Sequence, residues 1–206
     1  MRFRLLLSIL ILACATVGSA QDFPFEYWHE GKAVLTSGDT VRGKIKYDPQ
    51  NDIIQVELAN RFESYTSRKV VFYEIFDQKL NNYRQFVALP FAANGGYKTP
   101  VFFELLTEGK ITLLSREYLE YRSSNAGFYY YGNTSRLVLV YRYFLLKDNG
   151  NVVQIDARKT DFLDLMDSHA DEVRKYIKSN RLNLERKSDI GRAIAYYNQL
   201  VLKYGK

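Results

Sequence analysis

The sequence predicts an α+β protein: an antiparallel β sandwich, roll or small barrel, with two to three C-terminal helices packed on it. Short runs of alternating apolar and polar residues, separated by turn residues, fill residues 21–158. After residue 159 the apolar spacing changes to three and four, which is typical of helices. The length of 206 residues, with 47% hydrophobic residues and only four prolines, suits one folded domain over residues 21–206.

Residues 1–20 are predicted to be a secretory signal peptide. Arg2 and Arg4 supply the positive start, and Leu5–Ala13 supply an apolar stretch. Gly18–Ala20 then offer small residues for cleavage before the mature chain begins. The apolar stretch is shorter than the ~20 residues that a spanning helix needs. The pattern therefore predicts an exported protein, either periplasmic or secreted.

Cys14 leaves an alternative to simple cleavage. Ile11–Cys14 loosely resemble the motif at which bacterial lipoproteins are cut and acylated, so the protein could be lipid-anchored through Cys14. The bulky Leu12 fits that motif poorly, and cleavage after Ala20 is favoured. Because Cys14 is the only cysteine, a chain cut after Ala20 has neither disulfides nor thiol chemistry.

The net charge of +6 is not interpreted as nucleic-acid binding, because exported proteins seldom meet nucleic acid. It is compatible with a weak attraction to anionic glycans or membrane surfaces. No cofactor is predicted.

Residues 32–47 predict a β-hairpin. Ser37–Asp39 provide turn chemistry between two alternating runs. Lys44 and Lys46 lie on the polar face of the second run, where these lysines could pair with Glu57 on the next strand. The opposite face of the second run is expected to be buried and carries Val41, Gly43, Ile45 and Tyr47.

Further strands are expected wherever short apolar runs lie between turn residues such as Asp148–Asn151. One of these runs, Leu137–Leu146, is nearly all apolar, so it is predicted to be a central strand covered on both faces. The expected strands are Ile54–Leu58, Val70–Phe76, Tyr83–Leu89, Val101–Leu106, Ile111–Leu114, Leu137–Leu146 and Val152–Ile155.

The single domain is expected to have a β-rich part, residues 21–158, and a helical part, residues 159–206, with two to three helices. Thr160 is the expected cap of the first helix, which Asp167-Ser168 could break in two. Ser188 is the expected cap of the last helix. Neither helix is apolar all round, so no transmembrane span is expected after removal of the signal peptide. The apolar stripes are Phe162, Leu165, Met166, His169, Val173, Tyr176 and Ile177, then Ile190, Ala193, Ile194, Tyr197, Leu200, Val201 and Tyr204.

The motifs of common enzyme classes are absent. There is no G-x-S-x-G nucleophile elbow, no phosphate-binding G-x-x-x-x-G-K-[ST] loop and no G-x-G-x-x-G dinucleotide motif. The two histidines are expected to be structural: His169 on the apolar stripe of a helix, and His29 near a frayed N-terminus. No catalytic residue and no metal ligand is therefore predicted.

Acidic pairs leave one route to catalysis. Glu104 and Glu108 flank a predicted hairpin, and Glu117 and Glu120 follow it. Two carboxylates about 5–9 Å apart across a cleft suffice for glycoside hydrolysis. A carboxylate-based glycan hydrolase is therefore the alternative that involves catalysis.

The most distinctive segment carries four consecutive aromatic residues between Gly127 and Gly132. Exposed tyrosines offer flat, amphipathic contact area that suits sugar rings or a protein partner. The other interpretation is a short strand with alternate rings buried. The candidate ligand-binding residues are Phe128, Tyr129, Tyr130 and Tyr131.

The hairpin sequence also carries a resemblance. Within Gly31–Tyr47, the Gly38-Asp39-Thr40 turn is followed by Gly43-Lys44-Ile45 in a strand. This segment resembles the start of the mature chain in an uncharacterised group of exported β-rich proteins of Bacteroidota. The resemblance implies export and a β-rich fold, and it implies no catalytic residue, ligand or function.

Together these features predict an exported, non-enzymatic binding or accessory protein of the cell envelope. Its expected partner is an envelope protein or a glycan. The alternatives are a carbohydrate-binding module that uses the aromatic segment, and the carboxylate-based glycan hydrolase.

Overall fold

The computed structural model describes residues 22–59, 61–92, 96–124, 134–156 and 162–205. The predicted signal peptide with Cys14, the aromatic residues Phe128–Tyr131 and the predicted cap Thr160 lie outside the described residues.

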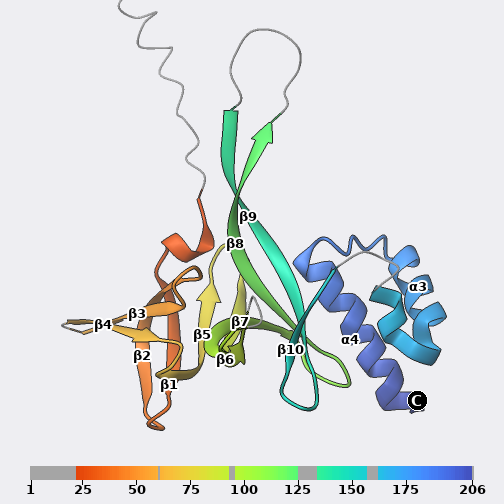
Figure 1. The fold of residues 1–206 in the computed structure, drawn as a ribbon, viewed down its shortest axis with the longest axis horizontal. Helices are drawn as coiled ribbons and strands as arrows, with labels where there is room; N and C mark the ends of the chain where they lie inside the picture. Colours follow the sequence, from red (N-terminus) through yellow and green to blue (C-terminus); the bar gives the residue numbers. More distant parts are fainter. Residues whose placement is uncertain (1–21, 60, 93–95, 125–133, 157–161, 206) are drawn as a thin grey trace, which may run out of the picture.

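Ten antiparallel strands form one open sheet, in the order β10-β9-β8-β7-β6-β5-β1-β2-β3-β4 (Figure 1). Two C-terminal helices pack on this sheet, which confirms the predicted α+β class. The strands are β1 (His29–Leu35), β2 (Thr40–Asp48), β3 (Ile53–Leu58), β4 (Arg61–Thr66), β5 (Val70–Asp77), β6 (Asn82–Phe91), β7 (Thr99–Thr107), β8 (Thr112–Ser124), β9 (Thr134–Leu146) and β10 (Val152–Ile155).

The predicted hairpin is formed by β1 and β2, which pair from His29↔Ile45 to Val34↔Thr40. Of the two lysines expected to face Glu57, Lys44 does so across β2 and β3, with 3.6 Å between the ammonium nitrogen and the carboxylate. Lys46 lies opposite Gln55 instead. The hairpin and the Lys44–Glu57 pair both follow from a period of two, which places one side of each strand in the core and the other in water.

The prediction for Leu137–Leu146 is wrong, because β9 is not a central strand. Among the described strands, its outer neighbour is the short edge strand β10, which pairs with Tyr143–Leu146. Tyr143, Phe144 and Leu145 are buried, whereas the preceding residues 137–142 are partly or fully exposed. The apolar residues of this run therefore lie on both faces of a two-stranded ribbon. They are not enclosed between two layers of the protein, as a central strand would be.

The sheet is strongly curled. In the sheet order β2 and β8 are five strands apart, which is about 24 Å in a flat sheet. Yet the hydroxyl of Tyr47 on β2 lies 3.0 Å from a carboxylate oxygen of Glu117 on β8. The curl encloses a core of side chains from β1–β3 and β5–β7, which contains Ala33, Ile45, Tyr47, Ile54, Val56, Val70, Tyr73, Ile75, Phe86 and Phe102.

The helices cover the other half of the sheet. The 3₁₀ helix η2 (Asp164–His169) leads into α3 (Ala170–Ser179), and α4 (Lys187–Tyr204) ends the described chain. The predicted break at Asp167-Ser168 is confirmed, because Asp167 has a non-helical backbone with φ 43°. The apolar stripes of these helices pack on Leu113, Tyr143 and Leu145 of β8 and β9. None of the helices in the described ranges is long and apolar enough to cross a membrane.

The predicted cap at Ser188 is wrong. Helix α4 begins at Lys187, with Arg186 as its N-cap and no side-chain cap. Instead, the Asp189 carboxylate accepts a hydrogen bond of 3.0 Å from the backbone N–H of Asn183. A residue inside the first turn therefore closes the preceding loop, which sequence spacing alone did not indicate.

Candidate functional site

The outer halves of β8 and β9 form a two-stranded ribbon that projects from the sheet (Figure 1). The two strands pair continuously from Thr112↔Leu146 to Ser124↔Thr134. However, β7 pairs with β8 only as far as Ser115, and β10 reaches β9 only from Tyr143. Residues 116–124 and 134–142, here called the arm, thus have no further strand beside them within the described chain.

An ion pair explains why β8 leaves β7. The Arg116 guanidinium binds the Asp52 carboxylate through two hydrogen bonds, of 3.0 and 3.1 Å. The same two side chains also bind the backbone of Phe102 in β7. The Phe102 N–H donates to Asp52 at 2.8 Å, and the Phe102 carbonyl accepts from Arg116 at 3.1 Å. Two side chains thus replace the strand that would otherwise satisfy these backbone groups.

One face of the arm is apolar along its outer half. The register places Leu119 opposite Leu139 and Tyr121 opposite Leu137, so all four side chains share this face. The three leucines are partly exposed, and Tyr121 is 76% exposed. No other element of the described fold covers these four side chains. They therefore form an exposed apolar surface of the kind that favours association.

The other face of the arm carries charge. Arg142 pairs with Glu120 at 2.9 Å and stacks on the ring of Tyr118, with 4.3 Å to the ring centre. Further out, Arg122 lies directly opposite Arg136. The predicted ligand residues Phe128–Tyr131 belong to the segment that joins the two strands of the arm in sequence, which is outside the described residues.

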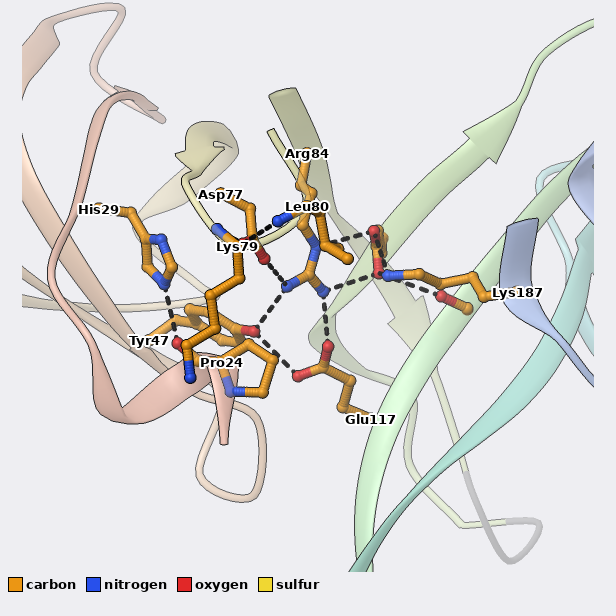
Figure 2. Close-up of polar contacts among 11 residues, drawn as sticks. Pro24, His29, Tyr47, Asp77, Lys79, Leu80, Arg84, Glu117 and Lys187 are labelled. Atoms are coloured by element: carbon orange, nitrogen blue, oxygen red, sulfur yellow. Dashed lines mark hydrogen bonds and ion pairs between the residues drawn. The ribbon is translucent and has the colours of Figure 1, made fainter. Parts of the chain in front are cut away.

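At the foot of the arm lies a buried ion cluster, formed by Asp77, Arg84, Glu104, Glu117 and Lys187 together with the hydroxyl of Tyr47 (Figure 2). Arg84 is its centre and is only 3% exposed. Its five N–H groups all have acceptors: Glu104 accepts two, and Asp77, Glu117 and Tyr47 accept one each. The guanidinium therefore has no donor left for a ligand.

Glu104 is held between two cations. Its two oxygens accept from Arg84 at 2.9 Å each, and from the Lys187 ammonium at 2.8 and 2.9 Å. Burial alone would raise the pKa of Glu104, but these two positive charges hold the pKa below its ordinary value. Glu104 is therefore a carboxylate at neutral pH and not an acid that could donate a proton.

Tyr47 and Glu117 complete the cluster on the side of the curled sheet. Tyr47 donates its hydroxyl proton to Glu117 at 3.0 Å and accepts from Arg84 at 2.9 Å. Burial raises the pKa of Tyr47 well above its ordinary value, so the hydroxyl keeps the proton that it donates. Asp77 accepts from the backbone N–H groups of Lys79 and Leu80 through its second oxygen.

The structure brings together two of the four predicted carboxylates. Glu104 and Glu117 meet at Arg84, whereas Glu120 pairs with Arg142 on the arm and Glu108 lies in the turn between β7 and β8. A cavity of about 20 Å³ adjoins Glu104 and Glu117, which is room for one water molecule and far below the ~300 Å³ of a small-ligand site.

A wider groove of about 870 Å³ lies along the first half of α4, and Glu104 is one of its lining residues. Both oxygens of Glu104 already accept hydrogen bonds from Arg84 and Lys187, so this carboxylate offers the groove no free base.

The two histidines have structural partners. His29 is 4% exposed, and its Nε2 lies 2.8 Å from the Pro24 carbonyl, so the expectation of a frayed position was wrong. This carbonyl belongs to the 3₁₀ turn η1 (Pro24–Glu26), which lies against β2. His169 lies 3.2 Å from the Gly205 carbonyl. In the described ranges, no three His, Cys, Asp or Glu side chains are grouped to hold a metal ion.

Sequence reasoning missed Arg84 and Lys187, and it placed Tyr47 correctly on a buried face without finding its polar partners. A signal for Arg84 was present, since it alternates with the exposed Tyr83 and shares the buried parity of Phe86. An arginine at an apolar position of a strand indicates a buried ion pair, although its partners come from strands that only the fold brings together.

Comparison with protein-family models, with curated proteins and with solved structures gives no match to this chain.

Proposed function

We propose that this is an exported, non-enzymatic protein of the cell envelope, and that it binds its partner through the arm. The observation that carries the proposal is the arm itself: a paired ribbon with a partly exposed apolar face and no strand beside it in the described chain. The leader-like pattern of residues 1–20 supports export.

The cost of the arm supports a binding role. A two-stranded ribbon is only marginally stable by itself in water, and exposed apolar faces favour association. Here a buried ion pair between Arg116 and Asp52 fixes the point at which the ribbon leaves the sheet. The projection of the arm is therefore a defined feature of the fold. Beyond Glu117 and Tyr141 the arm contributes no buried residue in the described ranges, so this part is best explained by contact with a partner.

The ion cluster supports the absence of catalysis. A general acid needs a raised pKa and a cleft, whereas Glu104 has a lowered pKa and Glu117 accepts from Arg84 and Tyr47. These carboxylates stabilise the meeting of five elements, β2, β6, β7, β8 and α4, and leave the arm as the candidate site.

The test is crosslinking from the arm in the native envelope. A photoreactive residue replaces Tyr121 on the arm and, as a matched control, Tyr83 on β6, which is 68% exposed. We expect specific crosslinks to an envelope component, whether protein, glycan or lipid, from position 121 and none from position 83. Glycan products alone would favour the carbohydrate-binding alternative for the same arm.

Two outcomes would contradict the proposal. Equal crosslinking from positions 83 and 121 would remove the special role of the arm. Turnover of a glycan that is abolished by Glu104→Gln or Glu117→Gln, with the fold intact, would establish an enzyme instead.

A further inference from the structure

Two arginines on the charged face of the arm have no carboxylate partner among the residues that the structure describes. Arg122 and Arg136 are directly opposite each other across β8 and β9, and both are exposed. Side chains at such positions have Cβ atoms about 5 Å apart, where like charges repel. Neither arginine forms an ion pair with any residue in the described ranges.

The other arginine pair on this face is neutralised. Arg116 and Arg142 are also directly opposite each other, but Arg116 binds Asp52 and Arg142 binds Glu120. Within the described part of the chain, carboxylates therefore compensate the inner arginine pair and leave the outer pair with an uncompensated charge of about +2. An anionic surface that meets the outer end of the arm would remove this repulsion.

Apolar side chains lie at the same end, on the reverse face. Tyr121 and Leu137 are the immediate neighbours of Arg122 and Arg136 in the two strands. A tyrosine with an exposed ring is typical of the boundary between lipid headgroups and acyl chains, and arginine reaches back from that boundary to the phosphates. The outer arm thus combines the two contacts that an anionic lipid surface offers together.

We propose that the outer arm, residues Tyr121, Arg122, Arg136 and Leu137, docks on an anionic lipid surface. The inference rests on the proposed function and names the partner of the same arm. A glycan offers no apolar interior for Leu137. A protein partner would have to cover both faces of a thin ribbon, whereas a lipid interface surrounds it on both sides.

The test is co-sedimentation of the whole chain with phospholipid vesicles. One set contains phosphatidylglycerol and phosphatidylcholine, and the other contains phosphatidylcholine alone. We expect binding to the anionic set and little to the zwitterionic set. Each arginine near an anionic surface contributes about fivefold in affinity, so Arg122→Ser with Arg136→Ser is expected to weaken binding about 30-fold.

The matched control removes the same charge elsewhere. Arg68 and Lys69 are exposed neighbours in the turn before β5, and Arg68→Ser with Lys69→Ser should leave vesicle binding unchanged. Tyr121→Ser with Leu137→Ser tests the apolar face, with a loss of about tenfold expected. All variants keep the same N-terminus, so any contribution of residues 1–20 cancels.

A direct contact measurement completes the test. Trp28 is the only tryptophan, so Trp28→Phe with Tyr121→Trp places a single fluorophore on the arm. A blue shift on adding anionic vesicles is expected, and the same probe at position 83 should not shift.

Three results would overturn the lipid proposal. These are equal loss of binding in the Arg68/Lys69 variant, no binding to anionic vesicles, and no spectral change at position 121. If position 121 still crosslinks a protein or glycan in the envelope, the proposed function survives and only the lipid assignment fails. If crosslinks and vesicle binding are both absent, both fail.

Discussion

At the scale of single residues, Arg84 stabilises the place where the two halves of the molecule meet. A buried charge is costly unless its partners satisfy it, and Arg84 has three carboxylates and a hydroxyl around its five N–H groups. Such a cluster stabilises little relative to an apolar core, but the loss of one member leaves the others buried without partners.

Replacing Arg84 with glutamine should therefore destabilise the fold strongly. The change leaves Asp77, Glu104 and Glu117 with one cation, Lys187, which contacts Glu104 alone. We expect a loss of about 3–5 kcal/mol in the free energy of unfolding in urea. Arg142→Gln is the control, since it breaks the exposed pair with Glu120 and should cost less than about 1 kcal/mol. Equal losses would show that the cluster is not special.

The lowered pKa of Glu104 gives the cluster an acid limit. A carboxyl whose pKa is lower in the folded state stabilises the fold above its unfolded value, near 4.5, and this stabilisation is lost as the pH falls through the lower folded value. We expect the free energy of unfolding to fall below about pH 4.5. Glu104→Gln should be less stable at pH 7 and show a shallower fall in acid. A variant with the wild-type slope would contradict this assignment.

At the scale of elements, the Asp52–Arg116 pair directs the arm away from β7 because it occupies the hydrogen-bonding groups of Phe102. Asp52 also adopts φ 53°, which aspartate and asparagine tolerate better than other non-glycine residues. The turn between β2 and β3 thus supplies both the bend and the acceptor.

Amide hydrogen exchange in an Asp52→Ala variant should test whether the Asp52 carboxylate holds the backbone of Phe102. Without the carboxylate, the Phe102 N–H loses its acceptor and should exchange about 5- to 150-fold faster, because an unmade hydrogen bond costs about 1–3 kcal/mol. Asp52→Asn keeps an acceptor and the backbone conformation, so it should retain most of the protection. Unchanged exchange in the alanine variant would show that another group holds the amide.

Several elements were predictable because each depends on local pattern. The hairpin of β1 and β2 follows from alternation and the Ser37–Asp39 turn, and the break before α3 follows from Asp167-Ser168. Strand β4 was missed because Arg61–Thr66 form an edge whose residues are mostly exposed, which gives no apolar alternation. The cluster around Arg84 was not predictable, since its members are joined by the curl of the sheet.

At the scale of the whole molecule, the ion cluster links the core enclosed by the curled sheet to the core under the helices. Lys187 at the start of α4 binds Glu104 of β7, and Tyr47 of the first core binds Arg84 and Glu117. Asn198 adds a second link from α4, with hydrogen bonds to the backbone of Glu108 and Ile111. The two cores should therefore unfold together.

Coincident unfolding curves would check this coupling. Trp28 lies at the end of the sheet formed by β1 to β4, where its ring centre is 5.5 Å from that of Phe62. Its fluorescence therefore reports the unfolding of the sheet. Circular dichroism at 222 nm, the usual helix signal, reports mainly α3 and α4. We expect the two signals to share one midpoint in urea. Helices that unfold at a lower concentration would contradict the single cooperative unit.

The central claim, that the arm is the binding site, is tested most directly by shortening it. Residues 118–140 are replaced by an Asn-Gly turn, which suits a two-residue hairpin and keeps Glu117 opposite Tyr141. We expect the shortened protein to keep its fold, with the ion cluster intact, and to lose binding to native envelope membranes that the full chain retains. Envelope binding by a folded, shortened protein that equals that of the full chain would contradict the claim.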